Sequence, residues 1–364
     1  MISFTLLPLL ELFTFISFFT FFAHNLIKFS IKNKINKKFL ILLTLIKIIF
    51  LVSIFFYGKA GYAVDAKSIY DMSSIFFYEI YTNFSLRVFY GSDFVSLLIS
   101  PFTIIGQLSY FNLSILFLLL GLYSSLLFYV VLRKYSKNRY QDILCMIIVL
   151  YPTLNIFTSY ITKDVLIFFL ISYFLYIINF DTRNRYFVFK ILVIAISILL
   201  IRPYVFIVLS FSTVFTFILF YKMKKIQELF FSLAFILVFI LIFSFLFNKI
   251  YIQVFTGNGN ILEQIFNYLG ERAKATNIGS AQINLTNLSF FGKIYNVLFG
   301  PPTFNFSFTD IVYFIDKMYL FFILLHLLFV KIKPLKIDSN RFKLFEVSLL
   351  FFSLLLFLLI SLSI

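Results

Sequence analysis

Runs of about twenty apolar residues, separated by clusters of lysine and arginine, dominate this sequence and limit what it can fold into. A helix needs ~20 apolar residues to cross the hydrocarbon core of a bilayer, and several runs here have that length. Hydrophobic residues make up 62% of the 364 residues, and only 13% are charged. A soluble domain of this size could not bury so much apolar surface, whereas a membrane protein exposes it to lipid. The sequence therefore predicts an all-α, polytopic membrane protein.

The apolar runs mark ten expected membrane crossings, which we assign to one integral membrane domain spanning 1–364. These crossings cover about residues 3–27, 39–57, 112–132, 143–160, 165–180, 187–201, 204–221, 229–247, 311–330 and 345–363. Residues 94–110 are also apolar but contain Pro101 and Gly106. We interpret them as a re-entrant or interfacial helix on the outer side, because a further crossing would break the alternation of charge between the loops.

The distribution of charge predicts how the crossings are oriented. Alternation places five basic loops on one side, with 20 of the 31 Lys and Arg residues and five acidic residues. The other side carries nine Lys and Arg residues and eight acidic ones. Basic loops stay in the cytoplasm, so both termini and the large loop are expected outside. The net charge of +16 then follows mainly from topology, with some lysines contacting anionic lipid headgroups, and it requires no nucleic-acid partner.

Two segments on the expected outer side, at about 58–110 and 248–310, are long enough to build a functional site. In the second, apolar residues recur at helical spacing over 261–269 and predict an amphipathic helix on the membrane surface, with Glu271 and Arg272 at its polar end. Simple solvation is the alternative explanation for charges in such loops. Neither a metal nor a cofactor is expected, because Cys145 is the single cysteine and the carboxylates do not cluster.

Three features favour a functional site over simple solvation. Lys163 and Asp164 form either a neutralised turn or part of a polar site between the fourth and fifth crossings. Arg202 ends a tight hairpin without an acid nearby in the sequence, so it is either a snorkelling side chain or a partner for a substrate phosphate. Asp65, eight residues beyond the second crossing, fits a general base on a sugar hydroxyl or a helix N-cap. The polar residues that lead into the bilayer before the Lys163-Asp164 pair are Thr153, Asn155, Thr158 and Ser159.

Other polar residues within the crossings are given simpler roles. Lys47, near the middle of the second crossing, is interpreted as a structural residue that faces the helix bundle. Glu11 is expected to reach the outer interface by snorkelling. His24 and His326 lie near the ends of their crossings on the basic side, too far from the outer loops for a catalytic role there.

The pattern as a whole resembles the O-antigen polymerases, also called oligosaccharide repeat-unit polymerases, of bacterial surface-polysaccharide synthesis. The likeness covers nearly the whole chain in layout, and its motifs are short. The residues that carry the likeness are Asp65 after the second crossing, Tyr151-Pro152 followed by Ser159 and Lys163-Asp164, Arg202-Pro203, and Gly279-Ser280 ahead of Gly300-Pro301-Pro302.

The resemblance implies an inverting glycosyltransferase at the outer face of the bacterial inner membrane. It would join undecaprenyl-diphosphate-linked repeat units, as in lipopolysaccharide synthesis, alongside a chain-length regulator and a flippase of the same pathway. Arg202 and Arg272 would stabilise the departing diphosphate, and Asp65, or else Asp164 or Glu271, would assist the acceptor hydroxyl. Substrate contacts would come from Arg87, Lys163, Asp164, Glu271 and Lys274.

Two alternatives stay open. A transferase of single sugars that uses polyprenyl-phosphate donors would share this architecture, and only the donor separates it from a polymerase. A non-enzymatic flippase or transporter would favour charged residues deep in its crossings and broken helices. Most of the non-cytoplasmic charge of this chain lies in loops instead, which favours the polymerase.

Overall fold

The computed structural model describes residues 3–57, 62–83 and 91–202, apart from 135, 137 and 182–184, together with 205–206 and 209–210. The chain divides into two compact units, Met1–Arg202 and Pro203–Ile364, and every helix named below belongs to the first. The four expected crossings from residue 204 onward and the predicted amphipathic helix at 261–269 lie outside the described residues. The part that is described consists of helices and contains no strand, as the sequence predicts.

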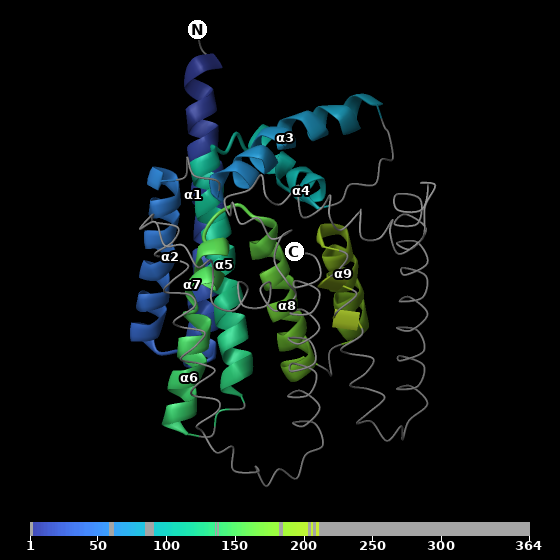
Figure 1. The fold of residues 1–364 in the computed structure, drawn as a ribbon. Coiled ribbons are helices and arrows are strands. Elements are labelled where there is room, and N and C mark those ends of the chain that lie inside the picture. Colours follow the sequence, from blue (N-terminus) through green and yellow to red (C-terminus); the bar gives the residue numbers. More distant parts are fainter. Residues whose placement is uncertain are drawn as a thin grey trace, which may run out of the picture. The chain divides into compact units, whose positions relative to one another are not determined.

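Four described helices are long and apolar enough to cross a membrane. They are α1 (Ser3–Lys32), α2 (Lys37–Tyr57), α5 (Tyr110–Arg133) and α8 (Lys163–Phe180). Each of these helices begins and ends within a few residues of an expected crossing, except that α1 continues five residues beyond the expected end. Figure 1 shows the four running side by side, with α5 in the middle of the group. Most of α5 is buried, because it packs against α1, α2 and α8.

The fourth expected crossing, 143–160, is wrong as a single helix. It consists of α6 (Arg139–Val149) and the short α7 (Pro152–Phe157), with a break at Leu150 and Tyr151. Pro152 explains the break, since a residue before proline is driven out of the α conformation and Tyr151 has φ −51° and ψ 123°. The Asn155 side chain covers the break by donating to the Val149 and Tyr151 carbonyls, both at 2.9 Å. Two backbone carbonyls at the interruption therefore have a hydrogen-bond donor within the protein, as backbone groups in a membrane interior require.

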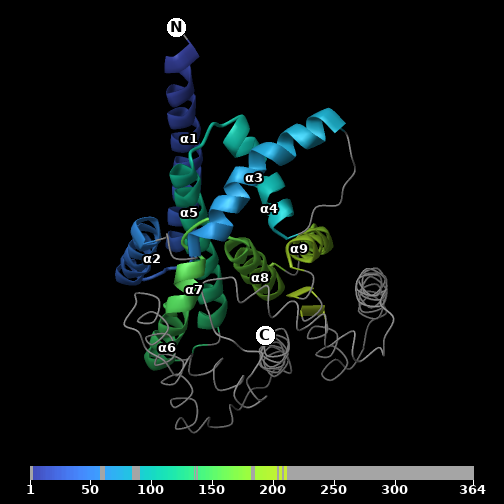
Figure 2. The same ribbon diagram turned by 45° about the horizontal axis from the view of Figure 1, so that its top comes forward.

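Residues 58–93, expected as a mixed-charge outer segment, contain a helix of 22 residues, α3 (Tyr62–Asn83). It packs against α4 (Ser92–Ile104), and both lie across the upper end of the group in Figure 1, where α8 begins. Figure 2 shows the same arrangement of α3 and α4 from a tilted view. With 13 residues, α4 is ~20 Å long, which is too short for a bilayer core of ~30 Å. A short helix here agrees with the re-entrant or interfacial interpretation of 94–110.

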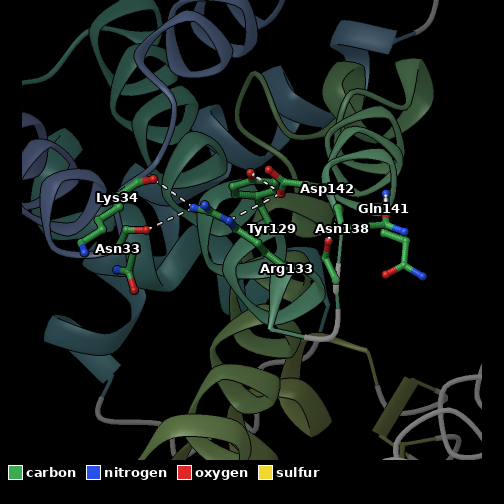
Figure 3. A network of polar contacts seen from close by, with 8 residues as sticks. Asn33, Lys34, Tyr129, Arg133, Asn138, Gln141 and Asp142 are labelled. Carbon is green, nitrogen blue, oxygen red and sulfur yellow. Dashed lines mark hydrogen bonds and ion pairs between the residues drawn. The ribbon is translucent and has the colours of Figure 1, made fainter. Parts of the chain in front are cut away.

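The opposite end of the group, where α1, α5 and α8 end and α2, α6 and α9 begin, carries the basic residues and is called the basic end below. There Arg133 donates to the backbone carbonyl of Lys34 at 2.9 Å and lies 3.5 Å from the Asp142 carboxylate (Figure 3). Tyr129 donates to the same carboxylate at 2.8 Å. Arg133 thus joins the turn between α1 and α2 to α5 and α6.

Candidate functional site

Three helix ends meet on the side of the group opposite the basic end. They are the start of α4, the start of α8 and the end of α9 (Phe187–Ile201), and we call their meeting point the helix-end junction. The Gly91 N–H donates to the Leu200 carbonyl at 2.9 Å, which ties α4 to α9. Lys163 Nζ donates to Ser92 Oγ at 3.0 Å, which ties α8 to α4. Two of the predicted site residues, Lys163 and Asp164, therefore sit at a point fixed by three helices.

An ion pair completes the junction. Arg202 Nη2 lies 2.5 Å from Asp164 Oδ1, and the side chains are 27% and 35% exposed. The two residues are 38 positions apart in the sequence, which is why the sequence shows no acid near Arg202. Arg202 is therefore not the lone cation that the sequence suggested, because Asp164 is its partner within the protein. Partial exposure leaves the guanidinium and the carboxylate within reach of a ligand.

Local sequence explains why each helix begins or ends at the junction. Thr162 caps α8, and its side chain accepts from the Val165 N–H at 3.2 Å. Helix α9 ends at Ile201 because Arg202 precedes Pro203 and takes extended angles, φ −145° and ψ 90°. Gly91 has φ +61°, a conformation that side chains disfavour, and it starts the turn into α4.

The helix dipoles favour this arrangement of charge. Asp164 is in the first turn of α8, where the partial positive charge of the helix N-terminus attracts a carboxylate. Arg202 follows the last residue of α9, where the partial negative charge attracts a cation. The junction also holds the Lys163 ammonium, while Asp93 lies in the first turn of α4. It therefore offers two cations together with carboxylates, an arrangement suited to an anionic ligand and to proton transfer.

The structure brings together three of the predicted site residues, Lys163, Asp164 and Arg202. Asp65 is the fourth residue of α3, inside the helix rather than in the N-cap position, and its side chain is outside the described part. Arg87, Glu271, Arg272 and Lys274 are also outside the described residues, so their roles stay predictions. Where the structure describes the chain, no group of three or more His, Cys, Asp and Glu residues could hold a metal ion.

Sequence reasoning missed several residues that the structure places at important contacts. Ser92 and Gly91 were absent from the candidates, although a Gly-Ser pair ahead of an apolar stretch is a signal for a helix start. Glu11 does not snorkel freely, because its carboxylate accepts from Ser109 N at 2.8 Å and from Asn112 Nδ2 at 2.7 Å at the start of α5. Lys47 faces the bundle, as predicted, and contacts Thr158 at the end of α7.

Comparison with protein-family models, with curated proteins and with solved structures finds no match for this chain.

Proposed function

We propose that this chain is a membrane-embedded polymerase that joins polyprenyl-diphosphate-linked oligosaccharide units at the outer face of the inner (cytoplasmic) membrane. The observation that carries the proposal is the helix-end junction, where Lys163, Asp164 and Arg202 meet at the end opposite the basic one. By the positive-inside rule that end faces outward, where lipid-linked units are available after export. The resemblance in layout to O-antigen polymerases supports the same assignment.

The Arg202–Asp164 ion pair suits such a reaction because it can exchange partners. Guanidinium binds a diphosphate in bidentate geometry, so an incoming donor competes with Asp164 for Arg202. Release of Asp164 leaves a carboxylate free beside the reacting groups. In the absence of substrate, the pair keeps both charges neutralised.

The proposed transfer step uses the two charges differently. The oxygen of the acceptor hydroxyl forms a bond to the anomeric carbon of the growing glycan, and its proton passes to the Asp164 carboxylate. The bond from that carbon to the diphosphate oxygen breaks, and its electron pair leaves with the diphosphate. Arg202 and Lys163 stabilise the charge that develops on the leaving group. Asp65 is an alternative proton acceptor, and Arg272 an additional cation, as the resemblance implies.

A second candidate function is a flippase or transporter of lipid-linked oligosaccharides. The observation that favours it is the broken helix α6–α7, with the buried Lys47 against its end, because transporters often bind substrates at interrupted helices in mid-membrane. Most of the non-cytoplasmic charge expected from the sequence lies in loops, which weighs against this class. The buried Lys47 is an ionisable residue deep within a helix, as a transporter would carry, and it weakens this argument. The functional test must therefore separate the polymerase from the flippase.

Deletion of the gene in its host, followed by gel analysis of the extracted surface polysaccharide, separates these functions. The deletion is complemented with wild type, Arg202→Gln, Asp164→Asn and the control Lys190→Gln. This control removes the Lys190–Asp181 ion pair, which joins α8 to α9 as the Arg202–Asp164 pair does. We expect the deletion to leave lipid core with a single repeat unit, and Arg202→Gln and Asp164→Asn to fail to restore the ladder. An intact ladder lacking one sugar would indicate the single-sugar transferase instead. Loss of even the single capped unit would contradict the polymerase and favour the flippase.

A further inference from the structure

Lys47 lies near the middle of α2 and is fully buried, with 0% of its surface exposed. Its ammonium donates to the Thr158 hydroxyl, a short contact, and lies 3.4 Å from the Thr158 carbonyl. No carboxylate among the described residues pairs with it. A lysine at the centre of a membrane helix is costly, so such residues persist mostly where they have a function in the protein. Here the ammonium fixes one specific point of the chain, the end of α7.

Thr158 opens a buried connector, defined as residues 158–162, that runs from α7 to α8. All five of its residues are buried although none is helical. The Ser159 hydroxyl donates to the Asn155 carbonyl, and the Thr162 hydroxyl donates to the Phe157 carbonyl at 2.7 Å. These contacts hold both ends of the connector to α7.

Helix α5 fixes the same point from another side. A Cβ atom on Gly121 would lie 1.9 Å from the Thr158 carbonyl oxygen, so the backbones of α5 and the connector are in direct contact. Thr158 is therefore held between Gly121 of α5 and Lys47 of α2. A residue held on two sides has little freedom to shift, and the connector inherits that restriction at its first residue.

The other end of the connector is the start of the helix-end junction. Thr162 caps α8 through the Val165 N–H, and the next two residues are Lys163 and Asp164. Lys163, which contacts Ser92, thus lies five positions after Thr158, and Asp164, which pairs with Arg202, lies six positions after it.

We propose that Lys47 is a positioning residue for the helix-end junction: by holding Thr158 it sets the connector, and through the connector it places Lys163 and Asp164. The effect on ligand binding rests on the proposed function, because the ligand is taken to be a prenyl diphosphate. The effect on the connector does not rest on it. The two effects are therefore measured separately.

The first measurement is the affinity for farnesyl diphosphate of the full-length protein in lipid nanodiscs, by isothermal titration calorimetry. Lys47→Met keeps the bulk and removes the donor, and Thr158→Val keeps the shape and removes the acceptor. Thr158→Ser retains the hydroxyl and is the matched control for Thr158→Val. Lys37→Met removes the same charge from an exposed position of α2. We expect Lys47→Met and Thr158→Val to raise Kd about 2- to 30-fold, and both controls to bind like wild type.

The second measurement reports on the connector without a ligand. Cys145 is replaced by serine, which removes the chain's single cysteine, and Ser159→Cys places a thiol where the side chain is fully buried. With Lys47 present, we expect this thiol to be protected from N-ethylmaleimide. With Lys47→Met added, we expect it to react faster at temperatures where tyrosine fluorescence and circular dichroism show the protein to be folded.

The outcomes distinguish the two hypotheses. Wild-type binding combined with an unchanged Kd in Lys47→Met and Thr158→Val would overturn the positioning role. An equal loss of affinity in Thr158→Ser would also overturn it, since the hydroxyl contact would then not be the cause. If wild type fails to bind farnesyl diphosphate, the proposed function fails, and the thiol measurement decides the positioning role by itself: continued protection in Lys47→Met rejects it.

Discussion

Two ion pairs join α8 to α9 at opposite ends of the same two helices, and they provide an internal control for the role of Asp164. Arg202 and Asp164 are 2.5 Å apart with 27% and 35% exposure, and Lys190 and Asp181 are 2.6 Å apart with 28% and 32% exposure. Distance and exposure therefore match closely. The pairs differ in their relation to the helix dipoles and in their distance from the proposed reaction.

The expected stability effects follow from those dipoles. A partly exposed ion pair contributes only about 0–1 kcal/mol, and this contribution is lost in Asp164→Asn and in Asp181→Asn alike. Asp164 also gains about 0.3–1 kcal/mol from the N-terminus of α8, whereas Asp181, the C-cap of α8, loses a similar amount at the other end. Asp164→Asn should therefore destabilise the protein by about 0.6–2 kcal/mol more than Asp181→Asn. Unfolding in mixed micelles, followed by circular dichroism, measures this difference.

The expected functional effects are much larger and fall on one pair. Loss of a proton acceptor lowers rates about 100- to 10,000-fold, and loss of a group that stabilises developing charge lowers them about 100- to 1,000-fold. We therefore expect Asp164→Asn and Arg202→Gln to abolish the polysaccharide ladder, while Asp181→Asn and Lys190→Gln leave it intact. Lys163→Met is a third variant at the junction, and it removes the ammonium that donates to the Ser92 hydroxyl.

A charge swap separates a structural ion pair from a reactive one. The double variant Asp164→Arg, Arg202→Asp restores an attraction between α8 and α9, so it should be more stable than the single charge reversals Asp164→Arg and Arg202→Asp. It should stay less stable than wild type, because both swapped charges oppose the helix dipoles. It should not recover the ladder, because the carboxylate and the guanidinium have exchanged places. A swapped protein that makes a normal ladder would refute the reasoning, since the pair would then act only by holding two helices together. Equal losses of the ladder at both ends of the helices would refute it as well.

Three further contacts give predictions that unfolding experiments in micelles can check. Gly121→Ala should destabilise the protein by about 1–3 kcal/mol, because the added Cβ would lie 1.9 Å from a backbone oxygen. Ser124→Ala, which loses only a hydrogen bond within its own helix, should change stability little. Equal effects of the two substitutions would contradict this packing. Glu11→Leu should cost about 1.5–3 kcal/mol by leaving the Ser109 N–H and the Asn112 side chain without their acceptor, and Glu11→Gln, which keeps a carbonyl oxygen, should cost less. Arg133→Met should destabilise the basic end more than Lys37→Met, because Arg133 contacts the Lys34 carbonyl and the Asp142 carboxylate, whereas Lys37 is exposed at the start of α2. Equal effects would show these contacts of Arg133 to be unimportant.

Helices with a continuous apolar run were predictable because length and hydrophobicity alone specify a crossing. The bounds of the expected crossing 187–201 coincide with those of α9, although its 15 residues make it shorter than the four helices that are long enough to cross a membrane. The expected crossing 165–180 differs from α8 by two residues. Helix α3 was not predicted, because its sequence alternates charged and apolar residues without a run of membrane length. Its buried residues Ala66, Ile69, Ser73 and Phe76 recur at three- and four-residue spacing, a signal of an amphipathic helix that was available in the sequence.

The site was predictable as a set of residues but not as a set of contacts. Lys163, Asp164 and Arg202 stood out because charges next to apolar runs are few, and two of them are adjacent. Their pairing depends on how α8 and α9 pack, which local sequence does not specify. The same reason hid the contact between Lys47 and Thr158, which are 111 residues apart. Pro152 did signal the break between α6 and α7, but an apolar run on both sides concealed it.

The contacts at the basic end bear on the choice between polymerase and transporter. A transporter must open its binding region alternately to each side, so elements at both ends have to separate during every cycle. Arg133 joins the turn between α1 and α2 to α6, and Lys134 donates to the Asn179 carbonyl of α8 at 2.6 Å (Figure 3 shows the Arg133 contacts). An opening between these helices would break such contacts, whereas a polymerase that works from the outer face can keep them. The contacts at the helix-end junction are partly exposed like those at the basic end, so exposure alone does not separate the two functions. The choice depends on whether loss of the Arg202–Asp164 pair, and not of the Lys190–Asp181 pair, abolishes the ladder.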